Sequence, residues 1–243
     1  MLQGCLNGDR MRDFHPATPC TPDELARDAE LAVNAGAAEL HIHPRGEDDL
    51  QSLRPDDVAS TLIAVRNRVP GVPVGLSTLW SIPPTGRARQ EHIRRWKILP
   101  DYVSINLIEE DAVEVMRIVL DKGIGIEAGL WSVQDAERFV TLPEARRCLR
   151  VLIEINEQDV EQGLEIADAI IAILDRADFK LPILLHGHEA LVWPLYREAI
   201  KRGFDGRIGL EDGSLLPSGV KAKDNQDLLR AAHDILQESR RET

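Results

Sequence analysis

The sequence predicts one (β/α)8 barrel, and the regular alternation of two kinds of segment supports this. Eight short segments are rich in apolar and β-branched residues: 2–6, 39–43, 74–77, 102–107, 125–130, 149–155, 183–186 and 207–211. Amphipathic helical patterns lie between consecutive segments, and strands that alternate with helices indicate a parallel sheet. The chain length allows about 30 residues for each of eight units, the size of a strand–helix unit in a closed barrel.

The first predicted helix shows how these units begin and end. Thr21 can cap the helix, Pro22 occupies its first position, and Glu24 completes a capping box. Gly36 follows the helix as a stop signal, and Gly123 precedes a later strand in the same way.

An open, doubly wound sheet is the alternative arrangement. It would more often carry a Gly-x-Gly-x-x-Gly fingerprint after the first strand, which Gly4, Gly8 and Asp9 do not form. No linker, low-complexity segment or shift in composition divides the chain. We therefore expect a single domain over residues 1–243.

The composition excludes several classes of partner. A formal net charge of −12, from 29 basic and 41 acidic residues, repels nucleic acid and anionic membranes at long range. No apolar stretch is long enough to cross a membrane, and the N-terminal residues do not resemble a signal peptide. The three cysteines show no metal-binding spacing and no sign of a disulfide framework. These features predict a soluble cytoplasmic protein.

Polar side chains lie at or just after the carboxyl ends of the predicted strands. They include Arg10, His41, His43, Ser77, Thr78, Asn106, His186, Glu211 and Asp212. In a parallel barrel the carboxyl ends of all strands share one mouth, where enzymes of this fold carry their chemistry. We therefore expect these side chains to surround one site.

His41 and His43 indicate a metal site. Residues two apart on a strand point to the same face, and two imidazoles in an apolar segment are costly unless they are paired or bind a metal. Glu211 supplies a third ligand, and two histidines with one carboxylate leave a fourth zinc position open, as in catalytic zinc sites. Two hydrogen-bonded histidines are the alternative. His186 and His188 are competing ligands, although the glycine between them predicts that His188 points away.

Further charged residues interrupt or follow the apolar strands. Arg207, four residues before Glu211, is expected on the inner face of the barrel and needs a carboxylate partner, either in the site or in a salt bridge that closes the barrel. Asp212 leaves the barrel wall in another direction and is a candidate general acid or base.

Two acids within apolar strands, Glu127 and Glu154, are expected to have different roles, and the sequence does not decide the role of the Ser77 hydroxyl. Glu127 is expected to serve the site, whereas Glu154 is expected to pair with Arg150 or Arg10. Ser77 binds substrate if it faces inward, but no Gly-x-Ser-x-Gly motif surrounds it, so it is not expected to be a nucleophile.

Several segments resemble the beta-keto acid cleavage enzyme family, which includes the 3-keto-5-aminohexanoate cleavage proteins. The resemblance rests on His-Pro-Ala-Thr-Pro at 15–19, on Ala-Gly-Ala-Ala at 35–38 before His41 and His43, and on Arg-Ile-Gly-Leu-Glu-Asp at 207–212. Residues 103–106, 127–130 and 186–194 resemble the family's middle strands and seventh unit. The resemblance covers nearly the whole chain in order.

The resemblance implies a zinc-dependent (β/α)8 barrel that cleaves a β-keto acid with acetyl-CoA, giving acetoacetate and a new CoA ester. It implies zinc at His41, His43 and Glu211, with Asp212 as catalytic acid or base and Arg207 as its partner. Ser77 and Glu127 match further catalytic-site residues, and Thr78, Asn106, Arg10 and His186 are expected substrate contacts. The partners are then a β-keto acid and a CoA thioester, and the family tends to form homo-oligomers.

The chain departs from the family's pattern in its loops. Leu79 and Trp80 replace two glycines, and Ile108 begins a segment that replaces a Gly-Ser turn. A basic cluster at Arg87, Arg89, Arg94, Arg95 and Lys97 is either a CoA phosphate site or a solvated helix face. The alternative functions are a metal-dependent aldolase or hydrolase that does not use CoA, and a non-catalytic binding barrel.

Overall fold

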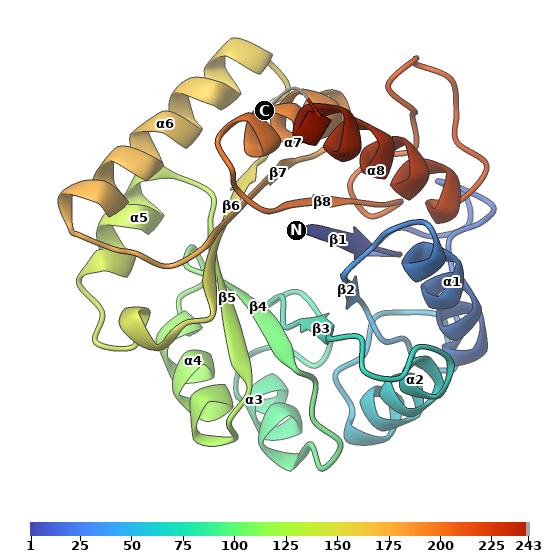
Figure 1. Ribbon diagram of the computed structural model, residues 1–243. Helices are drawn as coiled ribbons and strands as arrows, with labels where there is room; N and C mark the ends of the chain where they lie inside the picture. Colours follow the sequence, from blue (N-terminus) through green and yellow to red (C-terminus); the bar gives the residue numbers. More distant parts are fainter. Residues whose placement is uncertain (242–243) are drawn as a thin grey trace.

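A computed structural model describes residues 1–241 and shows a nearly closed barrel of eight parallel strands surrounded by helices (Figure 1). The strands are β1 (Leu2–Cys5), β2 (Glu39–Ile42), β3 (Val74–Ser77), β4 (Tyr102–Asn106), β5 (Gly125–Leu130), β6 (Arg150–Ile155), β7 (Ile183–Gly187) and β8 (Gly206–Ile208). Their order is β7-β6-β5-β4-β3-β2-β1-β8. The predicted fold class is confirmed.

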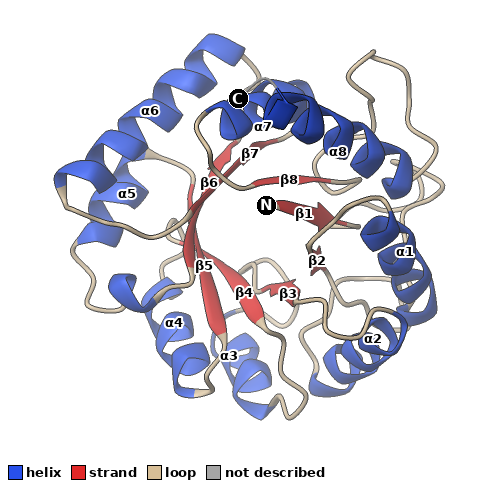
Figure 2. Cartoon of the chain, viewed as in Figure 1, coloured by secondary structure: helices blue, strands red, loops and turns tan. Residues whose placement is uncertain are grey.

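The helices form the outer layer of the molecule (Figure 2). They are α1 (Pro22–Asn34), α2 (Pro55–Arg68), α3 (Gly86–Arg95), α4 (Ala112–Asp121), α5 (Val133–Val140), α6 (Val160–Arg176), α7 (Val192–Lys201) and α8 (Asn225–Arg241). Thr21 caps α1 and forms the predicted capping box with Glu24. Within residues 1–241, no helix combines the length and the apolar character needed to cross a membrane.

The barrel closes between β7 and β8. Leu184 pairs in parallel with Asp205, whose backbone N–H also donates to the Ile183 carbonyl at 2.9 Å. On the other side of β8, β1 lies between β8 and β2, with Gly4 opposite Ile208 and Cys5 opposite His41. This order brings the carboxyl ends of β2 and β8 to either side of β1.

The last strand is shorter than predicted, because it ends at Ile208 rather than at residue 211. Gly209 lies so close to β1 that a Cβ atom there would be 1.8 Å from the Cys5 carbonyl oxygen. The chain then turns, and the Asp212 N–H donates to the Gly209 carbonyl at 3.0 Å. Glu211 and Asp212 therefore lie in a turn, and strand alternation does not set their directions.

A buried polar network fills the barrel interior toward the amino-terminal ends of the strands. Arg150 donates to Glu39 and, at 2.8 Å, to Glu127, which also accepts from Gln3 at 2.8 Å. Burial raises the pKa of Glu127, and the charge of Arg150 opposes this shift. Arg150 thus pairs with Glu127 and Glu39, and not with Glu154 as we expected.

Asp28 of α1 makes stability depend on pH. Its carboxylate is buried and accepts from Asn225 at 2.6 Å, and burial raises its pKa to about 7. Because the pKa of an unfolded aspartate is about 3.9, the contribution of Asp28 to stability is full below that pH and is lost as pH rises through 7.

Asp28→Asn is therefore expected to raise the melting temperature relative to the native protein, and more at pH 8 than at pH 5. The asparagine keeps an acceptor for Asn225 but carries no charge, so the gain should be on the order of 1–4 kcal/mol at pH 8. Thermal unfolding at both pH values measures it. A gain of equal size at both would contradict the assignment.

Candidate active site

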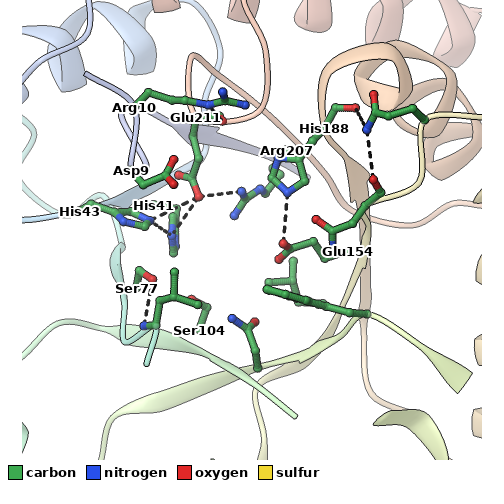
Figure 3. Close-up of a pocket in the computed structure, with 16 residues that line it drawn as sticks. Asp9, Arg10, His41, His43, Ser77, Ser104, Glu154, His188, Arg207 and Glu211 are labelled. Carbon is green, nitrogen blue, oxygen red and sulfur yellow. Dashed lines mark hydrogen bonds and ion pairs between the residues drawn. The ribbon is translucent and has the colours of Figure 1, made fainter. Parts of the chain in front are cut away.

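A cavity of about 410 Å³ lies at the carboxyl ends of the strands (Figure 3). All eight strand–helix units contribute to its lining, which consists of Asp9, Arg10, His41, His43, Ser77, Leu79, Ser104, Asn106, Trp131, Leu152, Glu154, Asn156, Gln158, His188, Arg207 and Glu211. The barrel thus brings together side chains that are far apart in sequence.

Three side chains on one wall of the cavity converge as metal ligands would. Nε2 of His41 lies 3.2 Å from Nε2 of His43, and these atoms are 3.7 and 3.4 Å from Oε1 of Glu211. Ligand atoms of a tetrahedral zinc site, each about 2.0–2.1 Å from the ion, are separated by about 3.3 Å. The spacing of this group fits a divalent cation (Figure 3).

The residues around His41, His43 and Glu211 leave these three side chains in a state that suits cation binding. Nδ1 of His43 lies 2.5 Å from the side-chain oxygen of Gln51, an acceptor that favours the tautomer with its proton on Nδ1, the form in which Nε2 can bind a cation. Burial lowers the pKa of His41 to about 3, so its ring is neutral. Oε2 of Glu211 is buried and has no hydrogen-bond partner among the described residues. Gly8 makes room for Glu211, because a Cβ there would meet its Cγ at 2.5 Å.

Arg207 connects two acids at the edge of the cavity. Its Nη2 lies 2.8 Å from Oε1 of Glu211 and 2.6 Å from Oδ1 of Asp212, and its Nε donates to the other oxygen of Asp212. Burial alone would lower the pKa of Arg207, but the charges of Asp212 and Glu211 outweigh it and raise the pKa well above its usual value. Asp212 is fully buried behind Arg207 and does not line the cavity.

A second group of titratable side chains lies on the opposite wall. Nε2 of His188 is 3.1 Å from Oε1 of Glu154, and Nδ1 of His188 is 3.6 Å from Oδ1 of Asp212. His186 is buried beside them, 3.7 Å from both carboxylates. His188 thus points into the cavity rather than away from it, and the partner of Glu154 is a histidine rather than Arg150 or Arg10.

The His186, His188 and Asp212 ligand atoms lie within 4.8 Å of one another, so this group also has the composition of a metal site. However, both oxygens of Asp212 already accept hydrogen bonds from Arg207. In the group around His41, Arg207 contacts only one oxygen of Glu211, so this group is the better candidate for a metal site.

The structure separates the other expected site residues into two sets. Ser77, Asn106 and Arg10 line the cavity, whereas Thr78, Glu127 and His186 do not. The Thr78 hydroxyl is directed to the Ser104 carbonyl at 2.7 Å, and Glu127 lies in the interior network. The Asn106 side-chain oxygen is buried and has no partner among the described residues.

One member of the basic cluster in and after α3 is not available to a ligand. Arg89 is fully buried and pairs with Glu109 and Asp111, at 2.9 and 2.6 Å. Arg94 pairs with Glu114 at 2.5 Å. Arg89 is therefore a structural residue, whereas Arg87, Arg94, Arg95 and Lys97 are exposed, so the choice between a CoA phosphate site and a solvated helix face rests on these four cations.

Several cavity residues were not among the predicted site residues. Glu154, Asn156 and Gln158 follow β6 as a polar run, which is the same signal that pointed to the histidines after β2. Gln51, which contacts His43 without lining the cavity, gave no such signal, because it lies in the loop after β2 and reaches His43 only through the folding of that loop.

A barrel whose eight strand ends surround one cavity, with a His-His-Glu group and a buried arginine–carboxylate pair, defines this protein as a (β/α)8-barrel enzyme. The sequence profile described as beta-keto acid cleavage enzyme matches residues 1–173 and 178–243. The chain therefore belongs to the beta-keto acid cleavage enzyme family, as the resemblance implied.

Curated relatives agree with this assignment. The chain is 22% identical to a 3-keto-5-aminohexanoate cleavage enzyme of Fusobacterium nucleatum subsp. nucleatum, over 95% of this chain and 88% of that protein. It is 38% identical to a 3-oxoadipate:acetyl-CoA acetyltransferase of Cupriavidus necator, but only over 28% of this chain and 24% of that protein.

Solved structures show the same fold. The complex of ObcA with oxaloacetate has a TM-score of 0.73 at 18% identity, over 92% of this chain. This chain spans only 64% of the ObcA chain. A type I 3-dehydroquinate dehydratase from Clostridium difficile has a TM-score of 0.67 at 10% identity, over 100% of this chain and 92% of that one. At these identities the likeness concerns the fold alone.

Proposed function

We propose that this enzyme transfers the acyl group of a β-keto acid to CoA, with acetyl-CoA as the second substrate. The reaction uses a divalent metal ion, for which zinc is the first candidate. The observation that carries the proposal is the His41, His43 and Glu211 group, whose ligand atoms converge at the wall of a cavity large enough for a small substrate. Family membership and the activities for which the two curated relatives are named support the choice of reaction.

The reaction balances without an oxidant or reductant. The bond between C2 and C3 of the keto acid breaks, and C2 becomes bonded to the carbonyl carbon of the acetyl group of acetyl-CoA, giving acetoacetate. The CoA thiol leaves the acetyl group and ends on the remaining acyl chain. An ion held by His41, His43 and Glu211 would supply Lewis-acid stabilisation of the charge that develops on the keto oxygen.

The other cavity residues orient the substrate and limit water. Ser77 and Asn106 present a hydroxyl and an amide toward the space beside the metal ligands. Leu79, Leu152 and Trp131 supply apolar surface to the same cavity. Holding both reactants in one geometry accounts for a large part of such a rate enhancement.

In this proposal Asp212 carries the proton. Arg207 lies between Asp212 and the cavity and orients the Asp212 carboxylate with two hydrogen bonds. A substrate carboxylate that enters the cavity competes for Arg207, which frees a lone pair of Asp212 for a proton. The cavity-lining position of Arg207 and the burial of Asp212 support this order of contacts.

The decisive experiment compares β-keto acids with and without acetyl-CoA. We expect acetoacetate and a new CoA ester, identified by mass spectrometry, only when acetyl-CoA is present. Suitable keto acids are 3-keto-5-aminohexanoate, 3-oxoadipate and unsubstituted 3-oxohexanoate. Cleavage at full rate without any CoA compound would instead favour a metal-dependent aldolase or hydrolase. Metal binding without turnover of any keto acid would favour a binding protein.

A further inference from the structure

Two of the three candidate metal ligands lie just beyond the ends of their strands. β2 ends at Ile42, directly before His43, and β8 ends at Ile208, before the turn that carries Glu211. His41, by contrast, lies within β2, where the strand pairs with β1. The hydrogen bonds of the sheet therefore fix the main chain of His41, whereas other groups must hold His43 and Glu211.

The hydrogen-bond ladder between β1 and β2 is interrupted where the strands reach the cavity. The Leu6 N–H still donates to the His41 carbonyl at 3.1 Å, so the next bond of a parallel ladder would join the His43 N–H to the Leu6 carbonyl. Instead, the His43 N–H donates to Oδ1 of Asn7 at 2.9 Å. The Leu6 carbonyl accepts from Nδ2 of Asn225 at 2.8 Å. Two side-chain amides thus replace one main-chain bond.

Asn7 holds both main-chain groups of His43. In addition to the bond at Oδ1, its Nδ2 donates to the His43 carbonyl at 2.9 Å. Nδ2 also donates, at 3.2 Å, to the Pro19 carbonyl in the loop before α1. Asn7 is fully buried, so these bonds are shielded from bulk water. The amide therefore fixes the main chain from which the His43 ring reaches the cavity.

Asn225 makes the corresponding link to the turn that carries Glu211. Its Oδ1 accepts from the Leu210 N–H at 2.7 Å, and its Nδ2 donates to Asp28 at 2.6 Å as well as to the Leu6 carbonyl. Asn225 is also fully buried, at the start of α8. One amide therefore joins the end of β1 to the residue that directly precedes Glu211.

We propose that Asn7 and Asn225 are positioning residues, which hold His43 and Glu211 at the separation that a divalent cation needs. The inference rests on the proposed function, in which the cation binds at these ligands. Nε2 of His43 lies 3.4 Å from Oε1 of Glu211 (Figure 3), close to the spacing of about 3.3 Å in a tetrahedral zinc site. Loss of either amide leaves a buried main-chain group without its partner and frees the strand end to move, so the ligand atoms lose part of this spacing.

Metal affinity in the absence of substrates tests the role of each amide. We expect Asn7→Ala and Asn225→Ala each to raise the dissociation constants for Zn²⁺ and Co²⁺ about 10- to 100-fold, the usual effect of losing an outer-shell partner of a metal ligand. The visible absorption bands of bound Co²⁺ depend on the geometry of its ligands, and they should change in both variants. Asn7→Ser keeps a hydroxyl that can bond to one main-chain group, so it should lose less affinity than Asn7→Ala.

Tyr196→Phe is the matched control, because it also removes a buried hydrogen bond from a side chain to the main chain. The Tyr196 hydroxyl donates to the Ala232 carbonyl at 2.9 Å, outside the cavity lining. This variant should have a lower melting temperature than the native protein, with native metal affinity and a native Co²⁺ spectrum. Melting temperature and circular dichroism are measured for every variant, which separates a loss of ligand position from a loss of folding.

Native affinity and an unchanged Co²⁺ spectrum in the folded Asn7 and Asn225 variants would overturn this inference and leave the proposed activity standing. An equal loss of affinity in Tyr196→Phe would do the same, because affinity would then follow stability rather than ligand position. If Co²⁺ binding instead survives replacement of His41 and His43, the metal assignment of the proposed function fails, and the inference with it. Absence of acetyl-CoA-dependent cleavage in a native protein that binds the cation would overturn the proposed reaction alone.

Discussion

Replacing His41 and His43 together by alanine is expected to remove the bound divalent ion and to reduce keto-acid cleavage to background, while the barrel stays folded. The two imidazoles are two of the three proposed ligands, and one carboxylate alone, that of Glu211, does not hold an ion tightly. The fold should survive, because backbone pairing holds β2 between β1 and β3, and a metal at the mouth of a barrel is not needed to form it.

Metal content by mass spectrometry, circular dichroism and the acetoacetate assay measure the three outcomes. The control is His92→Ala, which removes a histidine from α3, outside the cavity lining. It should keep close to one ion per chain. Full metal occupancy in the folded double variant would show that the ion binds elsewhere, and the second histidine group after β7 would then be the next candidate.

Asp212→Asn is expected to retain the metal and to lower kcat by about 10²- to 10⁴-fold, the usual range for a general acid or base. Asparagine keeps the size of the side chain but cannot accept the proton. It also takes one charged partner from Arg207, which then depends on Glu211 alone, so a lower melting temperature is expected as well.

Asp205→Asn separates these two effects. Asp205 precedes β8 and pairs with Arg150 and with the amino group of Met1, at the opposite end of the barrel from the cavity. It should lower stability without a comparable loss of kcat. Turnover near the native value in Asp212→Asn would make Asp212 a structural partner of Arg207, and an equal loss of kcat in both variants would point to closure of the barrel instead.

The barrel was predictable because its signals are local. Apolar segments of strand length, the capping box at Thr21 and the glycine after α1 each depend on neighbouring residues, and the structure has them where the sequence places them. The end of β8 was the exception. The strand ends before Gly209, where the backbone lies against Cys5 of β1 and then turns, with the Asp212 N–H donating to the Gly209 carbonyl; the contact with Cys5 is one that the local sequence does not contain.

The site was predictable only in part, because some of its features depend on local strand geometry and others on contacts between segments far apart in the sequence. That His41 and His43 share a face follows from the period of a strand, and the structure brings their Nε2 atoms to 3.2 Å. Glu127 and Glu154 look alike in sequence, since each is one acid in an apolar strand. Glu127 lies near the start of β5 beside Arg150, whereas Glu154 lies near the end of β6 and reaches the cavity.

By itself, then, the sequence determined the fold class, the strand order that places polar ends at one mouth, and the histidines of the candidate metal site. These follow from periodicity, capping and composition, which act over a few residues. Only the tertiary structure decided the partners of each buried charge: Arg150 with Glu127 and Glu39, Arg89 with Glu109, and His188 with Glu154. A buried charge pairs with whatever opposite charge the fold brings within about 4 Å, and that distance depends on register and on loop paths that sequence spacing does not encode.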